Sequence, residues 1–397
     1  MAEPMMGLTT SDITFAEATP EQCEISWRLR GEAWASPMSI EDYVERERYL
    51  SQQELTRDGC RHWVLYLKGY PRQVIASCES TRKRVLISDG AGGPVRESYG
   101  YTIANVYTNP AWRRQGCAAF LLRKVNEQLD LDSDCSVLYS DSGRMYYGGL
   151  GWVPFPSWQA NLILVPTPRS PTIVPQNDSD LVTGPPSPQA PKFLPRQPDR
   201  TRPIRLEDLP GLCELDQLHV RARFEALTAD SKTHITFLPT SAQIAWQLAR
   251  SQYDADKMLG KSITSKGAIT TSGSSWIYWA HDWRAKRLRI LRIVQGIKGN
   301  NSAEQRVGDV RVLLEAALAE ASAWGLPKVV VWNPDGMVTL SCKTLGNYHP
   351  QSVKITFDER MDGCVPSMRW RYPVDAEGKD APSKGIEWED NFGYCLS

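Results

Sequence analysis

One stretch decides the fold of this chain: Tyr101-Thr-Ile-Ala-Asn-Val-Tyr-Thr-Asn-Pro-Ala-Trp-Arg-Arg-Gln-Gly-Cys-Ala-Ala-Phe120. Its first part, 101–107, is rich in β-branched and aromatic residues and predicts a strand. Asn109-Pro110 is a turn dipeptide that ends the strand. Beyond Gly116, apolar residues recur at the spacing of one helix face, at Ala118, Leu121, Leu122, Val125 and Leu129.

The turn between this strand and helix has the composition of an anion site. A helix start leaves backbone N–H groups unpaired, and its dipole favours a negative charge. Gly116 and Ala118 keep side-chain bulk away, while Arg113 and Arg114 add positive charge. The stretch therefore predicts a diphosphate cradle, although a glycine there is also typical of a plain tight turn. It is neither a P-loop nor a dinucleotide fingerprint.

Two motifs carry a resemblance to a known family. Arg113-x-x-Gly116-x-Ala118 after a strand resembles the acetyl-CoA-binding motif of GNAT N-acetyltransferases. Tyr146-Tyr-Gly-Gly-Leu-Gly-Trp152 resembles the second signature of that family, with Gly148-Gly149 in place of bulkier residues. The resemblance implies an α/β (α+β) GNAT fold with a mixed central sheet.

Four further segments, at 138–143, 151–157, 275–283 and 388–395, sharpen this resemblance. They look like the fungal lysine ε-N-acetyltransferase family. That resemblance covers nearly the whole chain and is weakest in its proline-rich part. It implies acetylation of free lysine in a catabolic route.

Two domains joined by a linker are predicted along the chain. Residues 8–165 form the GNAT domain, 166–203 a proline-rich linker without regular structure, and 204–397 a second, degenerate GNAT-like domain. The last lacks the Arg-x-x-Gly-x-Ala motif, because 296–305 fills that place. We expect it to bind no CoA and to complete the substrate site.

The predicted elements follow the same plan in both halves. Strands are expected at 12–19, 62–67, 73–80, 136–140, 275–283, 288–294 and 329–332, helices at 20–34, 39–53 and 310–324, helical segments from 205 and 244, and a glycine-rich loop at 88–97.

The GNAT resemblance also implies site residues. Splayed strands would expose backbone N–H groups near Val106 and Tyr107 to the thioester. The residues expected to hold the cofactor acetyl-CoA are Val106, Tyr107, Thr108, Arg113, Arg114, Gln115, Gly116, Cys117, Ala118 and Ala119.

Three side chains are candidates for chemistry at this site. Tyr147 matches the family's proton donor to the departing sulfur; the alternative is a packed aromatic. Glu79 is the candidate base for the amine, or else a solvated carboxylate, and Asp141 binds the substrate ammonium or caps a helix. Cys117 is a possible nucleophile, but no histidine lies at a telling spacing, which favours a small cradle residue.

Composition bounds the remaining possibilities. Basic and acidic residues number 46 each, which favours neither nucleic acid nor an anionic membrane as partner. Nine scattered cysteines, no secretory signal and no apolar span predict a cytoplasmic protein. The five histidines lack metal-ligand spacing, so no metal is expected. The sequence does not indicate an oligomeric state.

The leading hypothesis is an acetyl-CoA-dependent N-acetyltransferase acting on a free amino acid, lysine first. One alternative is an acyltransferase for another small amine in fungal secondary metabolism. Another is a non-catalytic CoA-binding regulatory protein.

Overall fold

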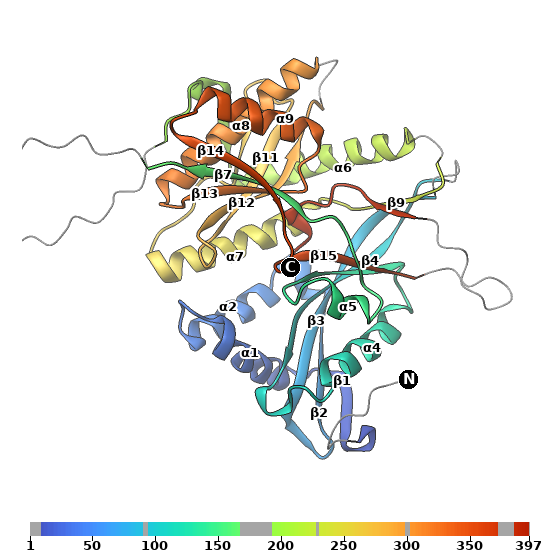
Figure 1. The fold of residues 1–397 in the computed structure, drawn as a ribbon. Coiled ribbons are helices and arrows are strands. Elements are labelled where there is room, and N and C mark those ends of the chain that lie inside the picture. The colour runs from blue at the N-terminus through green and yellow to red at the C-terminus, as the bar shows by residue number, and fades with distance from the viewer. Residues whose placement is uncertain are drawn as a thin grey trace, which may run out of the picture. The chain divides into compact units, whose positions relative to one another are not determined.

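The computed structural model describes residues 9–89, 94–166, 193–227, 230–297, 302–371 and 385–396. The chain forms two compact units that alternate along the sequence. The first unit comprises Met1–Trp158, Arg205–Thr264 and Glu359–Ser397, and the second comprises Gln159–Ile204 and Ser265–Asp358. Each contains its own β-sheet (Figure 1).

The sheet of the first unit is mixed. Its main path runs β1-β2-β3-β4-β5-β15-β6, while β9 pairs with the far part of β3 and β16 pairs with β9. The strands β4 and β5 are parallel, as are β9 and β16. Their bounds are β1 Ile13–Glu17, β2 Cys60–Leu67, β3 Tyr70–Asp89, β4 Arg96–Thr108, β5 Cys135–Ser140, β6 Val153–Pro154, β9 Thr233–Phe237, β15 Val365–Trp370 and β16 Ile386–Trp388.

Helices cover both faces of this sheet. Its described helices are α1 Pro20–Trp34, α2 Ile40–Ser51, α3 Glu54–Arg57, α4 Cys117–Leu129, α5 Met145–Gly148, α6 Leu209–Glu225 and α7 Ser241–Leu259. Because side chains alternate along a strand, Trp63 and Cys78 join the core under α4. Their neighbours His62 and Glu79 point to the other face, where they contact Trp27 and Arg30 of α1.

The second unit has a seven-stranded sheet in the order β14-β7-β13-β12-β11-β10-β8. Aliphatic side chains of α8 fill its core, among them Leu313, Leu314 and Leu318. The bounds are β7 Trp158–Leu164, β8 Thr201–Ile204, β10 Gly267–Thr270, β11 Trp276–Asp282, β12 Arg287–Val294, β13 Lys328–Trp332, β14 Val353–Glu359, α8 Ala303–Ala323 and α9 Gly336–Tyr348.

The two units exchange strands along the chain. The strand β7 follows the first unit in sequence but lies between β13 and β14 in the second sheet (Figure 1). In return, β15 lies directly beside β5 in the first sheet. These compact units therefore do not coincide with the consecutive domains predicted at 8–165 and 204–397.

The described part of the predicted linker contains a buried residue and a strand, which the sequence did not predict. Most of it, 167–192, lies outside the described residues, but Phe193 is buried in the core of the second unit. Thr201–Ile204 forms β8, so the prediction of no regular structure is wrong there. Pro203 is tolerated because β8 is an edge strand, which has one side free of partners.

The expected loop at 88–97 is also shorter than predicted. The strand β3 continues to Asp89 and β4 begins at Arg96, while 90–93 lie outside the described residues. Val85 and Ile87 pair with both β4 and β9, and this two-sided pairing extends the strand.

The predicted α/β class with a mixed sheet is confirmed, and the pattern occurs twice. In the first unit α4 connects the parallel strands β4 and β5. In the second unit α8 connects the parallel strands β12 and β13. The helix α4 begins at Cys117 and buries Leu121, Leu122, Val125 and Leu129, as the spacing predicted.

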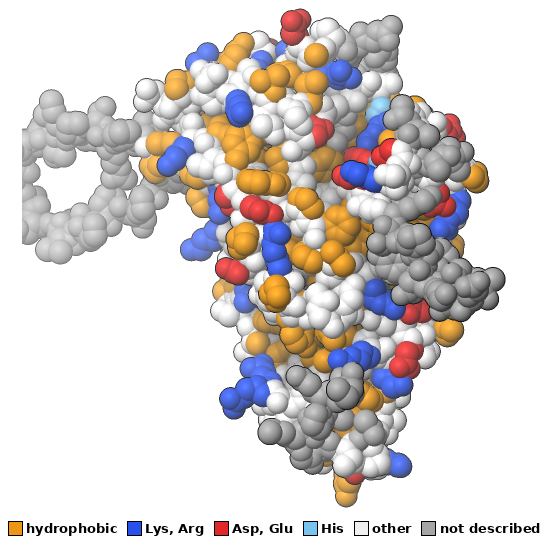
Figure 2. Space-filling view, turned by 45° about the vertical axis from the view of Figure 1, so that its right-hand side comes forward, with side chains coloured by type: hydrophobic (Ala, Val, Ile, Leu, Met, Phe, Trp, Pro, Cys, Tyr) orange, Lys and Arg blue, Asp and Glu red, His pale blue; other side chains and the backbone are white. Residues whose placement is uncertain are grey.

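The surface matches the balanced composition. On the face shown in Figure 2, acidic and basic side chains are interspersed among apolar ones. Among the described residues no helix combines the length and apolar character that a membrane crossing requires.

Candidate active site

The site begins where two neighbouring strands separate. The parallel ladder of β4 and β5 pairs Gly100–Ile103 with Cys135–Leu138 and ends there. The strand β4 continues to Thr108, whereas β5 is paired with β15 on its other side. In this part of the described chain, the β5-facing edge of β4 around Val106 therefore has no strand partner. Its backbone groups can bind a ligand instead.

A β-bulge lies at the point of separation. Ser77 pairs with Tyr107 and Glu79 pairs with Ala104, so two residues of β4 oppose one of β3. One of these two, Asn105, has a φ of 56°, in the left-handed region. Bulges redirect side chains and backbone groups and are over-represented beside active sites.

The helix α4 starts without a side-chain cap. Its N-cap is Gly116 with a φ of 76°, a conformation that favours glycine. The preceding Arg114 is also left-handed, with a φ of 62°. The Nε of Arg113 donates to the Thr108 carbonyl at 3.2 Å and so ties the turn to the end of β4. The first-turn N–H groups of α4 are thus left for an anion.

The predicted cofactor residues are brought together by this turn, but they differ in exposure. Arg113, Arg114 and Gly116 are exposed, whereas Ala118 is half-buried. Cys117 is buried in the core under α4, and burial raises the pKa of its thiol. A buried thiol with a raised pKa is a poor nucleophile. The geometry thus favours the predicted alternative of a small packing residue.

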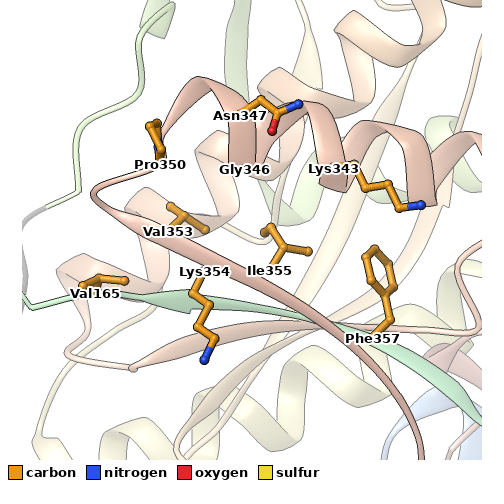
Figure 3. A pocket seen from close by; sticks show the side chains of 9 residues that line it. All are labelled: Val165, Lys343, Gly346, Asn347, Pro350, Val353, Lys354, Ile355 and Phe357. Carbon is orange, nitrogen blue, oxygen red and sulfur yellow. The ribbon is translucent and has the colours of Figure 1, made fainter.

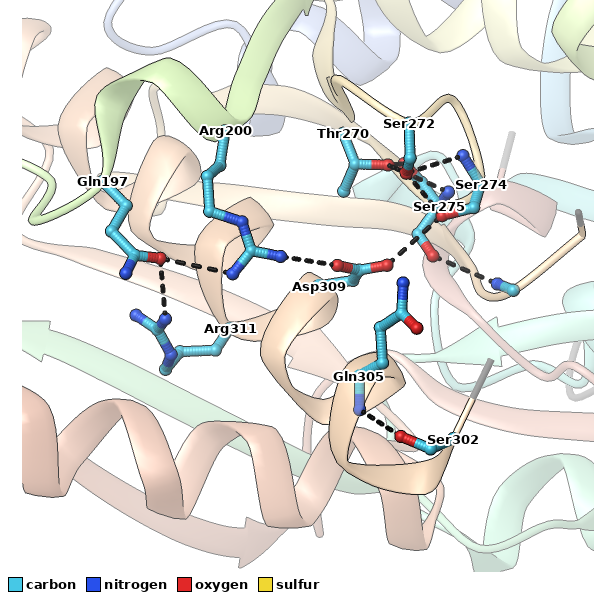
Figure 4. A network of polar contacts seen from close by, with 11 residues as sticks. Gln197, Arg200, Thr270, Ser272, Ser274, Ser275, Ser302, Gln305, Asp309 and Arg311 are labelled. Atoms are coloured by element: carbon cyan, nitrogen blue, oxygen red, sulfur yellow. Dashed lines mark hydrogen bonds and ion pairs between the residues drawn. The ribbon is translucent and has the colours of Figure 1, made fainter. Parts of the chain in front are cut away.

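The equivalent place in the second unit is closed by the chain's own side chains (Figure 4). Ser302 caps α8 by accepting the N–H of Gln305 at 3.2 Å. The buried Asp309 on the same helix accepts from Arg200 at 3.0 Å and from Ser274 at 3.2 Å. The hydroxyl of Ser302 thus occupies one first-turn N–H group of α8, and the absence of CoA binding by the second unit stays a prediction.

Tyr147 packs at the edge of the core that contains α4. Its ring meets Trp152 edge-on with centroids 6.4 Å apart, and Gly151, just before that tryptophan, is left-handed with a φ of 98°. Burial, reinforced by Tyr146, Cys78 and Asp141, raises the pKa of Tyr147 well above its usual range. The phenol therefore keeps its proton at neutral pH, as an acid must.

Glu79 lies in a buried polar cluster and is not solvated. Its Oε1 is 2.6 Å from Nη1 of Arg30 and 3.4 Å from Nδ1 of His62. Its Oε2 accepts from Nδ2 of Asn105 at 2.8 Å. The Arg30 side chain is only 1% exposed, so its charge depends on Glu79 and on Glu47, 3.2 Å away.

This environment sets the charge of the cluster. Burial would raise the pKa of Glu79, but the Arg30 charge and then His62 outweigh it and hold that pKa well below its usual range. Burial would lower the pKa of His62, but the Glu79 carboxylate outweighs it and raises that pKa. A carboxylate held this way is a weak base. The geometry gives Glu79 a positioning role at the bulge, and its predicted role as base stays a prediction.

Asp141 is exposed at the end of β5, as predicted. Its Oδ1 accepts the backbone N–H of Cys364 at 2.9 Å. The carboxylate thus holds the loop before β15, and no helix begins at it. Binding of a substrate ammonium by Asp141 stays a prediction.

One pocket of about 590 Å³ lies in the second unit, and none of its lining residues is a predicted site residue. It opens between α9 and β14, with the ammonium groups of Lys343 and Lys354 at its rim (Figure 3). Its lining residues are Val165, Lys343, Gly346, Asn347, Pro350, Val353, Lys354, Ile355 and Phe357.

Comparison with known proteins decides the family. Residues 182–396, more than half of the chain, match the family described as the LYC1 GNAT-like C-terminal domain. The chain belongs to this family. It is an N-acetyltransferase of the GNAT type, and the resemblance found in the sequence is confirmed.

Two individual relatives agree with this assignment. A lysine acetyltransferase of Yarrowia lipolytica is 22% identical over 280 residues, which span 65% of this chain and 70% of that protein. A probable N-acyltransferase of Enterococcus faecalis V583 superposes with a TM-score of 0.51 at 11% identity, over 90% of this chain and 72% of its own. The second likeness shows the fold alone.

The sequence analysis of this GNAT chain missed the partners of Glu79. Arg30 and His62 were not singled out, and neither was Asn105. A signal existed for Arg30, which follows Cys23 and Trp27 at the helical spacing i, i+4, i+7 and so shares their face of α1. Asn105 gave no signal, because an asparagine within a strand pattern does not predict a bulge.

Replacing Glu79 tests the positioning role. Glu79→Gln should lower the free energy of unfolding by about 3 kcal/mol at pH 7, because it leaves the buried Arg30 without its main counter-charge. The folded-state pKa of Glu79 is lowered, so its contribution is present above its unfolded pKa, about 4.3, and is lost as the pH falls further. Because the raised pKa of His62 also depends on Glu79, the difference should grow as the pH falls from 8 to about 6.5, stay level to about pH 5 and shrink below it.

Glu17→Gln is the matched control. Glu17 pairs with Arg61 at 3.2 Å, but its side chain is 52% exposed, so its loss should cost less than about 1 kcal/mol. If both variants are equally stable at pH 7, Glu79 has no positioning role.

Proposed function

We propose that this protein transfers an acetyl group from acetyl-CoA to the amino group of a free amino acid, with the ε-amine of lysine as the first candidate. The amine attacks the thioester directly. The observation that carries the proposal is the separation of β4 from β5 beside an uncapped α4, within a GNAT chain.

The residues present fit acetyl-CoA. A diphosphate suits the N-terminus of α4, where Gly116 leaves room and Arg113 and Arg114 supply positive charge. The pantetheine arm suits the unpaired edge of β4 around Val106 and Tyr107, with Thr108 at the end of that strand. When bound, acetyl-CoA supplies the activated acyl group.

The protein's own groups supply the remaining chemistry. Backbone N–H groups at the bulge polarise the thioester carbonyl and stabilise the charge that develops on its oxygen. Tyr147 is assigned as the donor of the proton that the departing sulfur takes. Its raised pKa keeps the phenol protonated at neutral pH and also makes it a weak acid, so the transfer has to accompany cleavage of the C–S bond. Cys117 is buried and takes no part as a nucleophile.

The attacking amine must be neutral. A lysine ε-ammonium has a pKa of about 10.4, and the pairing of Glu79 with Arg30 weakens the base that was predicted there. We therefore infer that the site takes up the neutral amine, or that water carries its proton away. Glu79 acts on the reaction through Asn105, which it holds at the bulge.

The identity of the acceptor is open to a direct test. Thiol release from acetyl-CoA should be fastest with free lysine in a panel that includes ornithine, other amino acids, polyamines and aromatic amines. The lysine acetyltransferase of Yarrowia lipolytica supports this order. Preference for another amine would favour the acyltransferase alternative. Tight CoA binding without turnover on any amine would favour a regulatory protein.

Gly116→Glu should abolish CoA binding, because a side chain and a negative charge would occupy the diphosphate position. Gly69→Glu is the matched control: Gly69 is also left-handed, with a φ of 80°, and no atom lies within 4 Å of an added Cβ. Calorimetric titration with CoA should show normal affinity for the control only. Unchanged CoA affinity in a folded Gly116→Glu protein would refute the proposal that the N-terminus of α4 binds the diphosphate.

Tyr147→Phe should lower turnover on the order of 10²-fold at neutral pH while CoA affinity hardly changes, as expected when a general acid is removed. A thiol has a pKa of about 8.5, so the thiolate leaves more easily as the pH rises. The deficit should shrink toward about pH 9, while the raised pKa of Tyr147 keeps the wild-type phenol protonated.

Tyr146→Phe is the control, because the neighbouring ring is exposed and should matter little. Turnover of all three proteins is measured from about pH 6.5 to 9.5 around the thiol pKa. A loss below about threefold for Tyr147→Phe at every pH would remove Tyr147 from the mechanism.

A further inference from the structure

A thiol, an imidazole and a carboxylate lie in a row on the α1 face of the first sheet. Cys60 and His62 are two residues apart on β2, so their side chains share one face. Sγ of Cys60 is 3.8 Å from Nε2 of His62, and Nδ1 of His62 is 3.4 Å from Oε1 of Glu79. The three groups therefore have the order nucleophile, imidazole and orienting carboxylate.

The charge of this row favours a reactive thiol. The Glu79 carboxylate raises the pKa of His62, so the imidazole carries a proton at neutral pH. Arg30 adds a second positive charge next to Glu79. Reactive cysteines sit in partly exposed surroundings beside such cations. Cys60 is partly exposed, whereas six of the nine cysteines are buried.

A second thiol lies in the same cluster. Cys23 is on α1, one helical turn before Trp27, whose ring meets the His62 ring edge-on at 5.9 Å. It is also partly exposed. Cys60 and His62 are both close enough to act on the charge of Cys23. Burial raises the pKa of Cys23, so this thiol is a weak nucleophile toward peroxide, and its suitable partner is the more electrophilic sulfenic acid on Cys60.

A metal ion fits these residues less well than a reactive thiol does. Cys60, His62 and Glu79 are close enough together to contact one ion. However, the thiol and the carboxylate face different nitrogens of the imidazole. Arg30 also lies 2.6 Å from the carboxylate, where its charge repels a cation.

We propose that Cys60 is a peroxide-reactive thiol assisted by His62, with Cys23 as the thiol that resolves it. The Cys60 sulfur attacks one oxygen of hydrogen peroxide, so that an S–O bond forms and the O–O bond breaks. The proton of the Cys60 thiol leaves to solvent before the attack. Sulfur then loses two electrons, the leaving hydroxide takes the proton of His62 to become water, and His62 regains a proton from solvent. The Cys23 thiol then displaces the oxygen as a second water, forming a disulfide.

Oxidation of Cys60 should also affect the hydrogen bonding at the β4 bulge. Glu79 contacts His62 with one oxygen and holds Asn105 with the other. A change at Cys60 that moves His62 therefore alters the hydrogen bonding of Asn105. Oxidised protein should lose acetyl transfer and regain it with dithiothreitol. This consequence rests on the proposed function, whereas the thiol chemistry does not.

The test is peptide mass spectrometry of the full-length, pre-reduced protein after exposure to dilute hydrogen peroxide. Dimedone traps sulfenic acid, and iodoacetamide blocks the remaining thiols. Cys364, the third partly exposed cysteine, is the internal reference. We expect Cys60 to be consumed at least about tenfold faster than Cys364, with a Cys23–Cys60 disulfide as product. Consumption at the rate of Cys364 would overturn the proposal without any variant being made.

Two variants define the roles of the neighbours. In Cys23→Ser the dimedone adduct on Cys60 should replace the disulfide, and in His62→Gln the rate at Cys60 should fall to within about threefold of Cys364. Circular dichroism of each variant checks the fold. A His62→Gln protein that is folded and reacts as fast as wild type would overturn the assistance by His62.

Two further measurements separate the remaining outcomes. One zinc ion per chain in the purified protein, together with protection of Cys60 from labelling, would overturn the thiol assignment in favour of a metal site. In Cys60→Ser, acetyl transfer should resist peroxide. If the reduced wild type turns over no amine, the proposed function fails, while rapid labelling of Cys60 would still uphold the redox site.

Discussion

The candidate site of the first unit depends on the contacts that the buried carboxylate of Glu79 makes. It joins α1 through Arg30, β2 through His62 and β4 through Asn105. Arg30 is only 1% exposed, so it is tolerated only with its counter-charges in place. Because Asn105 is left-handed within a strand, it needs a specific partner to stay there. Glu79 meets both needs and so fixes where β4 leaves β5.

The helices α4 and α8 occupy equivalent places in their units but differ at their N-caps. Both α4 and α8 connect parallel strands of their sheet. At α4 the N-cap is Gly116, which offers no side chain, so the N–H groups remain available. At α8 the hydroxyl of Ser302 takes one of them. A serine at the cap thus uses one first-turn N–H group for the fold, whereas a glycine leaves that group for a ligand.

The sequence predicted local features well and long-range pairing poorly. The helix α1 was found at its true bounds, because Thr19 caps it and Pro20 opens it. The strands β9, β15 and β16 were missed as members of the first sheet, because periodicity says nothing about which sheet a strand joins. The row of Cys60, His62 and Glu79 could not be predicted from the sequence either. The register that places His62 opposite Glu79 is set by the pairing of β2 with β3, which the sequence alone does not give.

The exchange of strands explains why the match to a C-terminal family bears on the N-terminal site. The matched residues 182–396 include β15, which pairs along the whole of β5 from Cys135 to Ser140. They also include β9, which continues the sheet along β3. Without β15, β5 would be an open edge beside the proposed cradle, with its backbone groups unpaired on that side. The sheet that carries the proposed acetyl-CoA cradle is thus completed by residues more than 200 positions later in the chain. Its stability therefore depends on both halves of the sequence.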